Sequence, residues 1–216
     1  MNKKIALFDF CDTLIKGQSI SLFLEYLYHQ EGSLWKKIKI KLNRKTNPFS
    51  SGDSLRYKNY LLRPFRHLDR NQLEMLGKSF CYDVLLNNTR HSVIERLEQH
   101  KANNIECVIV SGGFDIYLTY FASHYGIKHV ISTRLKFEGN QFLGKIDGTE
   151  CLGRNKISKL NDVLALDEFD LKNSYAYSDH LSDKYLLSLV GNVYLIDFGQ
   201  NISWKQNEWK VIKVAN

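Results

Sequence analysis

Four short segments of this sequence carry side chains that suit the binding of a phosphate group or a metal ion. They are Asp9-Phe-Cys-Asp-Thr13, Ser111-Gly-Gly113, Lys156 and Asp179-His-Leu-Ser-Asp183. A serine hydroxyl and glycine amides at the start of a helix donate hydrogen bonds to phosphate oxygens, since glycine lets the backbone approach closely. A lysine adds a point charge, and carboxylates are the hard oxygen ligands that Mg²⁺ prefers. These residue types indicate phosphoryl chemistry.

The polar segments follow short apolar runs or lie near them. Buried strands are expected at 5–10, 107–113, 130–132, 174–179 and 193–197. Patterns typical of helices lie between them, at about 90–103, 114–125, 155–165 and 181–190. A β-hairpin is predicted at 134–146, where the residues alternate around Gly139. Alternating strands and helices predict an α/β fold with a doubly wound parallel sheet, in which ligands bind at the carboxyl edge of the strands.

One long segment interrupts this alternation. Residues 17–88 contain no convincing buried strand, while 21–28 and 73–80 have the spacing of amphipathic helices. We therefore expect 17–88 to be a helical cap that is inserted after the first strand. The α/β core would then consist of residues 1–16 and 89–216.

The composition excludes several classes of protein. Hydrophobic residues make up 44% and charged residues 25% of the 216 residues, which is ordinary for a chain with a buried core. Two prolines and 13 glycines exclude disordered and collagen-like chains. Asp9 interrupts the first apolar run too early for a signal peptide. Four scattered cysteines indicate neither a disulfide framework nor a zinc cluster. We expect a cytoplasmic protein without stable membrane insertion.

Positive charge is concentrated in one segment. Residues 35–70 contain 11 Lys or Arg and two Asp, a local net charge of +9, against +7 for the whole chain. Such a block can steer an anionic partner or form a solvated helix face. Its aromatic residues leave a nucleic-acid surface as one alternative, but no recognised motif supports it and we expect no nucleic-acid partner. Trp35 and the interleaved lysines of 33–42 leave a membrane surface as another.

The order of the four segments resembles the haloacid dehalogenase superfamily of phosphohydrolases, in particular the branch that includes phosphoserine phosphatase. The resemblance covers nearly the whole chain and implies Mg²⁺-dependent hydrolysis of a small phosphorylated metabolite. It implies that Asp9 attacks phosphorus and forms an aspartyl-phosphate, with Thr13 donating a hydrogen bond nearby. Ser111, Gly112 and Lys156 would hold the phosphoryl group. The implied metal ligands are Asp9, the backbone carbonyl of Cys11, Asp179 and Asp183.

Cys11 departs from the pattern of this family. Its phosphatases usually carry a second Asp two residues after the nucleophile, which protonates the leaving oxygen and later activates water. Here Asp12 comes one residue later, and such a slip points a side chain elsewhere. Acid–base help contributes about 10²–10⁴-fold in rate. Three interpretations stay open: a phosphatase assisted by Asp12, Cys11, a cap residue or the substrate; another transfer chemistry of the superfamily; or a weakly catalytic or non-hydrolytic protein that binds a phosphometabolite.

Candidates for contacting the rest of the substrate lie mainly in the expected cap. Glu25 is near the place where related phosphatases have an acidic residue that reads a substrate amine, and a solvent-facing role is the alternative. Arg56, Arg63 and Arg66 could bind a second anionic group. His180, within the last acidic motif, could face the cleft or simply start a helix.

Overall fold

A six-stranded parallel sheet forms the centre of this computed structural model, which describes residues 3–30 and 54–215. The strands are β1 (Ile5–Phe8), β2 (Glu106–Phe114), β3 (His129–Thr133), β6 (Tyr175–Ser178), β7 (Asn192–Asp197) and β8 (Lys210–Lys213). Their order in the sheet is β3-β2-β1-β6-β7-β8, and every neighbouring pair is parallel. The predicted α/β fold with a doubly wound sheet is therefore confirmed.

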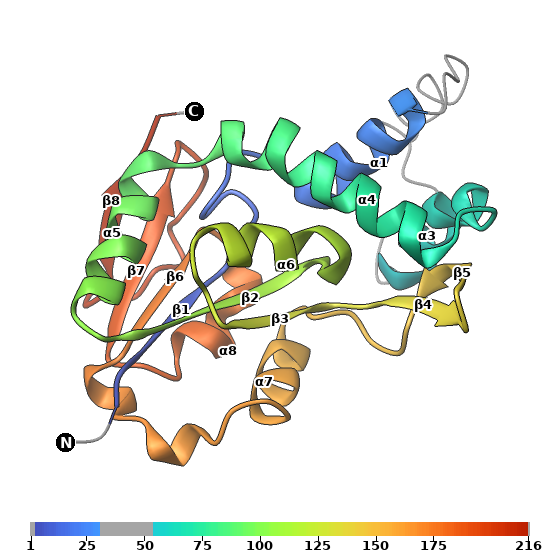
Figure 1. Ribbon diagram of the computed structural model, residues 1–216. Coiled ribbons are helices and arrows are strands. Elements are labelled where there is room, and N and C mark those ends of the chain that lie inside the picture. The colour runs from blue at the N-terminus through green and yellow to red at the C-terminus, as the bar shows by residue number, and fades with distance from the viewer. Residues whose placement is uncertain (1–2, 31–53, 216) are drawn as a thin grey trace.

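Helices cover both faces of the sheet (Figure 1). Successive side chains of β1 point to opposite faces, as strand geometry requires. Ala6 and Phe8 join the hydrophobic cluster beneath α5 (His91–Ala102) and α6 (Asp115–His124). Ile5 and Leu7 join the cluster beneath α7 (Arg154–Asn161) and α8 (Lys184–Leu187). Both faces of β1 are buried, which explains its uninterrupted apolar sequence.

The strand order reverses at β1. The chain runs outward from β1 through β2 to β3, then returns to place β6, β7 and β8 on the other side of β1. In open sheets of this kind a crevice forms where the order reverses, outside the carboxyl ends of the strands. The segments that begin at Asp9 and Asp179 follow the two strands at this point.

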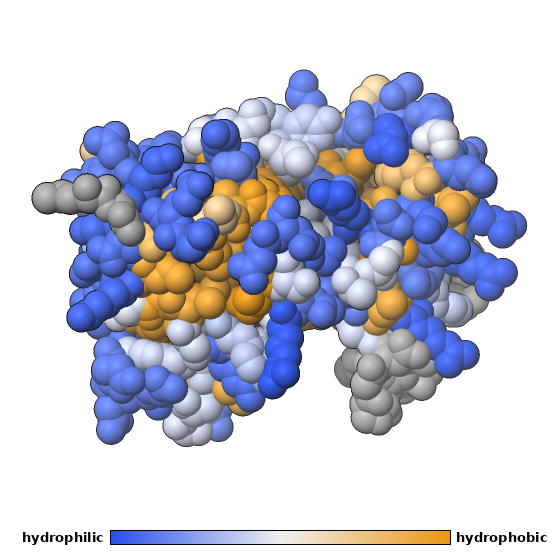
Figure 2. Space-filling view, turned by 90° about the horizontal axis from the view of Figure 1, so that it is seen from below, coloured by the Kyte–Doolittle hydropathy of each residue, from blue (hydrophilic) through white to orange (hydrophobic). Residues whose placement is uncertain are grey.

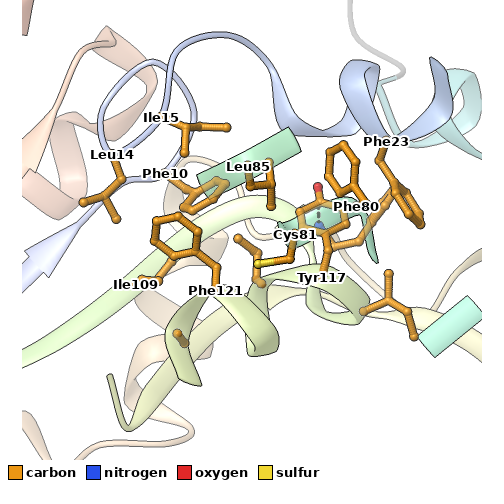
Figure 3. Close-up of a cluster of buried hydrophobic side chains, with 14 of the residues drawn as sticks. Phe10, Leu14, Ile15, Phe23, Phe80, Cys81, Leu85, Ile109, Tyr117 and Phe121 are labelled. Carbon is orange, nitrogen blue, oxygen red and sulfur yellow. Dashed lines mark hydrogen bonds between the residues drawn. The ribbon is translucent and has the colours of Figure 1, made fainter. Parts of the chain in front are cut away.

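The described part of the 17–88 insertion is helical and contains no strand. Its elements are α1 (Ser19–Gln30), α3 (Ser54–Leu62), the 3-10 turn η1 (Arg63–Phe65), α4 (Arg70–Phe80), the π-helical turn η2 (Cys81–Leu85) and the 3-10 turn η3 (Leu86–Asn88). Phe23 of α1 and Phe80 of α4 pack on Tyr117 of α6, with ring centroids 5.1 and 5.2 Å apart (Figure 3). One hydrophobic cluster thus joins the insertion to the sheet. The domain boundaries at 16/17 and 88/89 stay a prediction.

The predicted hairpin is present as the antiparallel pair β4 (Leu135–Glu138) and β5 (Gln141–Ile146). Gly139 in its turn has a φ of +55°, which glycine adopts without strain. One element was missed and one expectation was wrong in detail. The edge strand β8 was not predicted, and 181–190 contains only a 3-10 turn, Leu181–Asp183, followed by the short α8. The His180 ring accepts a hydrogen bond from the amide of Ser182, which favours the tight turn.

Seen from below, hydrophobic side chains form a large group left of the centre and smaller groups on the right, bordered by hydrophilic ones (Figure 2). Among the described residues, no helix combines the length and the hydropathy that crossing a membrane would require. The lysine-rich stretch 33–42 and the six basic residues of 36–45 lie outside the described residues. The membrane-surface alternative for that stretch therefore stays untested.

Candidate active site

Asp9 and Asp179 each directly follow the carboxyl end of a strand, β1 and β6 respectively, and these two strands are adjacent in the sheet. The amide of Asp9 continues the strand pairing by donating a 2.9 Å hydrogen bond to the carbonyl of Tyr177. Both carboxylates are buried and line a cavity of about 350 Å³. The core residues predicted to act here meet in that cavity: Asp9, Cys11, Ser111, Gly112, Lys156, Asp179 and Asp183.

Lys156 is the cation of this group. It lies in the first turn of α7, and its fully buried Nζ donates to Asp9 Oδ1 at 2.7 Å and to Asp183 Oδ2 at 2.8 Å. The hydroxyl of Ser178 also donates to Asp183 Oδ2, at 2.7 Å. Burial alone would lower the pKa of Lys156, but the two carboxylates outweigh it and hold the pKa above its ordinary value. The lysine is therefore charged and fixed in place.

Negative charge exceeds positive charge in the cavity. Three carboxylates, from Asp9, Asp179 and Asp183, face the ammonium of Lys156, while the second lysine of the cavity, Lys58, is paired with Glu150. Burial raises the pKa of Asp9 to about 7; Lys156 opposes this shift, and the charges of Asp183 and Asp179 add to it. Burial, with a further contribution from the charge of Asp12, raises the pKa of Asp179 to about 7 as well. With all three carboxylates ionised, their charge would exceed that of Lys156 by two, so protons or a bound cation must offset it near neutral pH.

This imbalance suits a divalent cation. Oδ1 of Asp183 is buried and has no hydrogen-bond partner among the described residues. Those residues contain no group of three or more His, Cys, Asp or Glu side chains placed to hold a metal ion by themselves. Mg²⁺ needs fewer protein ligands than such a group provides, since it commonly binds through one or two carboxylates and keeps several waters. The donors present, hard oxygens in excess of positive charge, fit Mg²⁺.

The last residues of β2, where its pairing with β3 shifts register, supply neutral donors. The Ser111 hydroxyl accepts a 3.0 Å hydrogen bond from the amide of Gly113, so its own hydrogen is free to point into the cavity. A Cβ on Gly112 would lie 2.6 Å from Cδ2 of Leu152, which shows why this position lacks a side chain. Thr13, predicted to bond near Asp9, instead donates to Asp179 Oδ1 at 3.2 Å. Its hydroxyl orients the second carboxylate.

Cys11 occupies the position at which the resemblance implies a catalytic acid–base Asp. Its Sγ lies 3.1 Å from the hydroxyl of Ser19 and accepts a 3.3 Å hydrogen bond from the amide of the same residue. Ser19 in turn contacts the hydroxyl of Tyr117 at 2.9 Å. Burial first, then the charge of Asp9, raises the pKa of the Cys11 thiol to about 12. The thiol therefore keeps its proton at neutral pH.

Asp12 does not line the cavity, so its candidacy as a catalytic acid is not supported by its position. Its backbone has a φ of +54°, and its carboxylate accepts 2.7 Å hydrogen bonds from the amide of Gly17 and the side chain of Gln18. Arg90 donates to its carbonyl at 3.0 Å. The one-residue slip has the effect expected from the sequence, because Asp12 is turned into the following loop, which it stabilises.

The insertion forms the other side of the cavity, mainly with apolar side chains. The cavity is lined there by Ile20, Leu24, Tyr57 and Leu61, with Gln18, Ser21 and Lys58 as the polar members. Lys58 forms an ion pair with Glu150, and both side chains are largely buried. Glu25 and Arg56, two predicted substrate contacts, do not line this cavity, whereas His180 does.

The residues of α3 that line the cavity were not identified from the sequence. Tyr57, Lys58 and Leu61 have the spacing of one helix face, which is a usable signal. Their basic and aromatic neighbours obscured that signal, and the ion pair with Glu150 joins residues that are far apart in the sequence.

Comparisons with known proteins give a consistent result. The model of the family described as haloacid dehalogenase-like hydrolase matches residues 6–188. A "probable phosphatase" of Mycobacterium tuberculosis is 23% identical over 144 residues, which cover 60% of this chain and 50% of the relative. This chain spans about half the length of the curated relatives it matches.

Solved structures share the fold. A crystal structure of a protein of unknown function from Bordetella pertussis Tohama I has a TM-score of 0.85 and 20% identity, covering 98% of this chain and 99% of that one. A substrate-bound phosphoserine phosphatase complex has a TM-score of 0.68 and 17% identity, covering 97% and 93% of the two chains. At identities of 17–20%, these similarities show a shared fold and nothing more specific.

Proposed function

This chain belongs to the haloacid dehalogenase-like hydrolase family, and we propose that it is a phosphatase that releases phosphate from a small phosphomonoester. The observation that carries the proposal is the position of Lys156, which bridges Asp9 and Asp183 at the base of the cavity. Phosphoryl transfer depends mostly on positioning and on neutralising charge, and this bridge does both. The similarity to a relative described as a probable phosphatase supports the same proposal.

Asp9 is the proposed nucleophile. One of its carboxylate oxygens would form a bond to phosphorus while the bond from phosphorus to the leaving oxygen breaks, which gives an aspartyl-phosphate that water hydrolyses. Lys156, the Ser111 hydroxyl and the Gly112 amide would hold the phosphoryl oxygens. The Cys11 thiol keeps its own proton at neutral pH, so the reaction would run without a strong general base at that position.

We propose Mg²⁺ as the cofactor. Asp9, Asp179 and the backbone carbonyl of Cys11 would hold it, with Asp183 contributing directly or through a water molecule. When bound, Mg²⁺ supplies positive charge for the substrate phosphate and brings the site to neutrality. The excess of carboxylates over Lys156 and the unpartnered Asp183 Oδ1 support this assignment.

The leaving group is proposed to be largely apolar. In the described insertion wall, Lys58 is the one charged side chain that lines the cavity, and Glu150 already pairs with it. Phosphoserine would bring an ammonium and a carboxylate against Leu24 and Leu61, where they would lose hydration and where the insertion offers no carboxylate for the ammonium. Phosphate esters of aryl or alkyl alcohols fit this wall better.

A panel of phosphate esters tests the proposal. Phosphate release would be measured from phenyl phosphate, butyl phosphate, glycerol phosphate and phosphoserine, with Mg²⁺ and with EDTA, using Asp9→Asn as the inactive control. We expect metal-dependent turnover that favours phenyl and butyl phosphate. No release from any ester, combined with an increase in melting temperature on adding phosphate, would favour the second candidate, a phosphometabolite-binding protein that Cys11 leaves without catalytic help.

A further inference from the structure

A second cavity of about 460 Å³ lies on the opposite side of α3. It shares no lining residue with the active-site cavity. α3 directs Lys58 and Leu61 into the active-site cavity, and Asn59 and Tyr60 into the second one. One helix therefore forms a wall of both cavities. The second wall of the new cavity is β5 of the hairpin.

The second cavity is strongly basic. Its charged lining residues are Arg56, Arg63, Arg66 and Lys145, and its described lining contains no acidic residue. Arg63 and Arg66 are three residues apart at the 3-10 turn η1, where side chains at this spacing lie one above the other. Lys145 approaches from β5, on the other wall. Cations from two separate elements thus converge on one space.

Specific contacts build the walls of this cavity. The amide of Ile146 in β5 donates a 2.8 Å hydrogen bond to Oδ1 of Asn59 in α3. Gly144 has a φ of +67°, and a Cβ at this position would lie 3.0 Å from Cα of Arg63 and 3.1 Å from Cβ of Arg66. A glycine is therefore required for β5 to approach η1 this closely. The fold fixes the walls of the cavity, from which the exposed side chains of Arg63, Arg66 and Lys145 extend.

A bound anion would offset the repulsion between these like charges. Like charges three or four residues apart destabilise a helical segment, and a concave surface focuses their field. Among the described residues, no carboxylate pairs with Arg63, Arg66 or Lys145. The size of the cavity is that of a small-molecule site rather than of an extended groove for a polymer. We propose that this cavity binds a small, multiply charged anion of the diphosphate class, separately from the substrate phosphate.

The two cavities can be distinguished by charge. Without metal and in alkaline buffer, the active-site cavity carries excess negative charge from Asp9, Asp179 and Asp183 and repels an added anion. Titration of inorganic pyrophosphate into the protein in EDTA, followed by calorimetry, therefore reports on the basic cavity. The test variants are Arg63→Ala/Arg66→Ala and, from the other wall, Lys145→Ala.

The control is Lys128→Ala/Arg134→Ala, which removes two exposed cations outside both cavities. We expect one pyrophosphate per chain, a Kd at least about tenfold higher in Arg63→Ala/Arg66→Ala, a smaller increase in Lys145→Ala, and no more than about a twofold change in the control. Unchanged melting temperatures would show that the variants fold. No binding by the natural chain, or equal affinity in Arg63→Ala/Arg66→Ala, would overturn the proposal. Binding of RNA or anionic vesicles in place of pyrophosphate would also overturn it, by assigning a macromolecular surface.

Discussion

Replacing Cys11 with aspartate should accelerate the proposed reaction. The thiol lines the cavity, 3.1 Å from the hydroxyl and 3.3 Å from the amide nitrogen of Ser19. A carboxylate in its place would accept hydrogen bonds from the same donors. The neighbouring charge of Asp9 would raise its pKa, and an acid–base group is most effective when its pKa is near the working pH.

General acid–base help contributes about 10²–10⁴-fold, but the surroundings of Cys11 are shaped around a thiol that is shorter than a carboxylate. We therefore expect a gain of about 10- to 100-fold in kcat. The assay is steady-state phosphate release with Mg²⁺ from p-nitrophenyl phosphate, which has a good leaving group, and from butyl phosphate, which has a poor one. A gain confined to butyl phosphate would show that the missing proton transfer limits the first step, in which the alcohol leaves and the phosphoenzyme forms. Equal gains on the two esters would show that the missing proton transfer limits hydrolysis of the phosphoenzyme, the step that both esters share.

Cys11→Asn is the matched control, because it has nearly the same shape as Cys11→Asp and cannot transfer a proton. It should show no gain on either ester. If Cys11→Asp is folded by circular dichroism and is no faster than Cys11→Asn on both esters, then the absence of an acid–base group at position 11 does not limit the reaction and the reasoning is refuted.

Three further predictions concern stability and are tested by urea unfolding. Lys156→Met should cost about 3–5 kcal/mol and abolish turnover, since it leaves buried carboxylates without their cation; full stability would contradict the ion-pair geometry. Gly77→Ala should cost about 1–3 kcal/mol, because its Cβ would lie 2.2 Å from the carbonyl oxygen of Ile116, whereas the exposed Met75→Ala should change little. Burial, with the charge of Arg96, lowers the pKa of His100 from 6.5 to about 4, so its neutral form stabilises the fold above pH 6.5 and up to about 3 kcal/mol is lost as the pH falls towards 4. His100→Gln should flatten that part of the stability profile, and an unchanged slope would argue against a buried neutral imidazole.

The sheet and the phosphate end of the site could be predicted because their signals are local. An apolar run that ends in Asp9 or Asp179 defines both a buried strand and the group that the strand delivers. The parallel topology then brings those strand ends to one edge, which requires no knowledge of side-chain packing. The position of Lys156 followed from its place in the first turn of a helix.

The substrate end could not be predicted because it depends on packing between distant segments. Glu25 and Arg56 had suitable chemistry, but the orientation of α1 and α3 directs neither into the active-site cavity. Lys58 enters it because Glu150, far along the chain, pairs with it. The strand β8 was missed because lysines at both ends and a short apolar centre make Lys210–Lys213 resemble a surface loop.

Trapping of the phosphoenzyme tests the central claim most directly. The protein would be quenched with acid during turnover of phenyl phosphate and Mg²⁺, then digested and analysed by mass spectrometry, with Asp9→Asn treated in parallel. The account predicts a phosphoryl group on the peptide that contains Asp9, and neither label nor phosphate release from Asp9→Asn. Undiminished phosphate release by Asp9→Asn would contradict it.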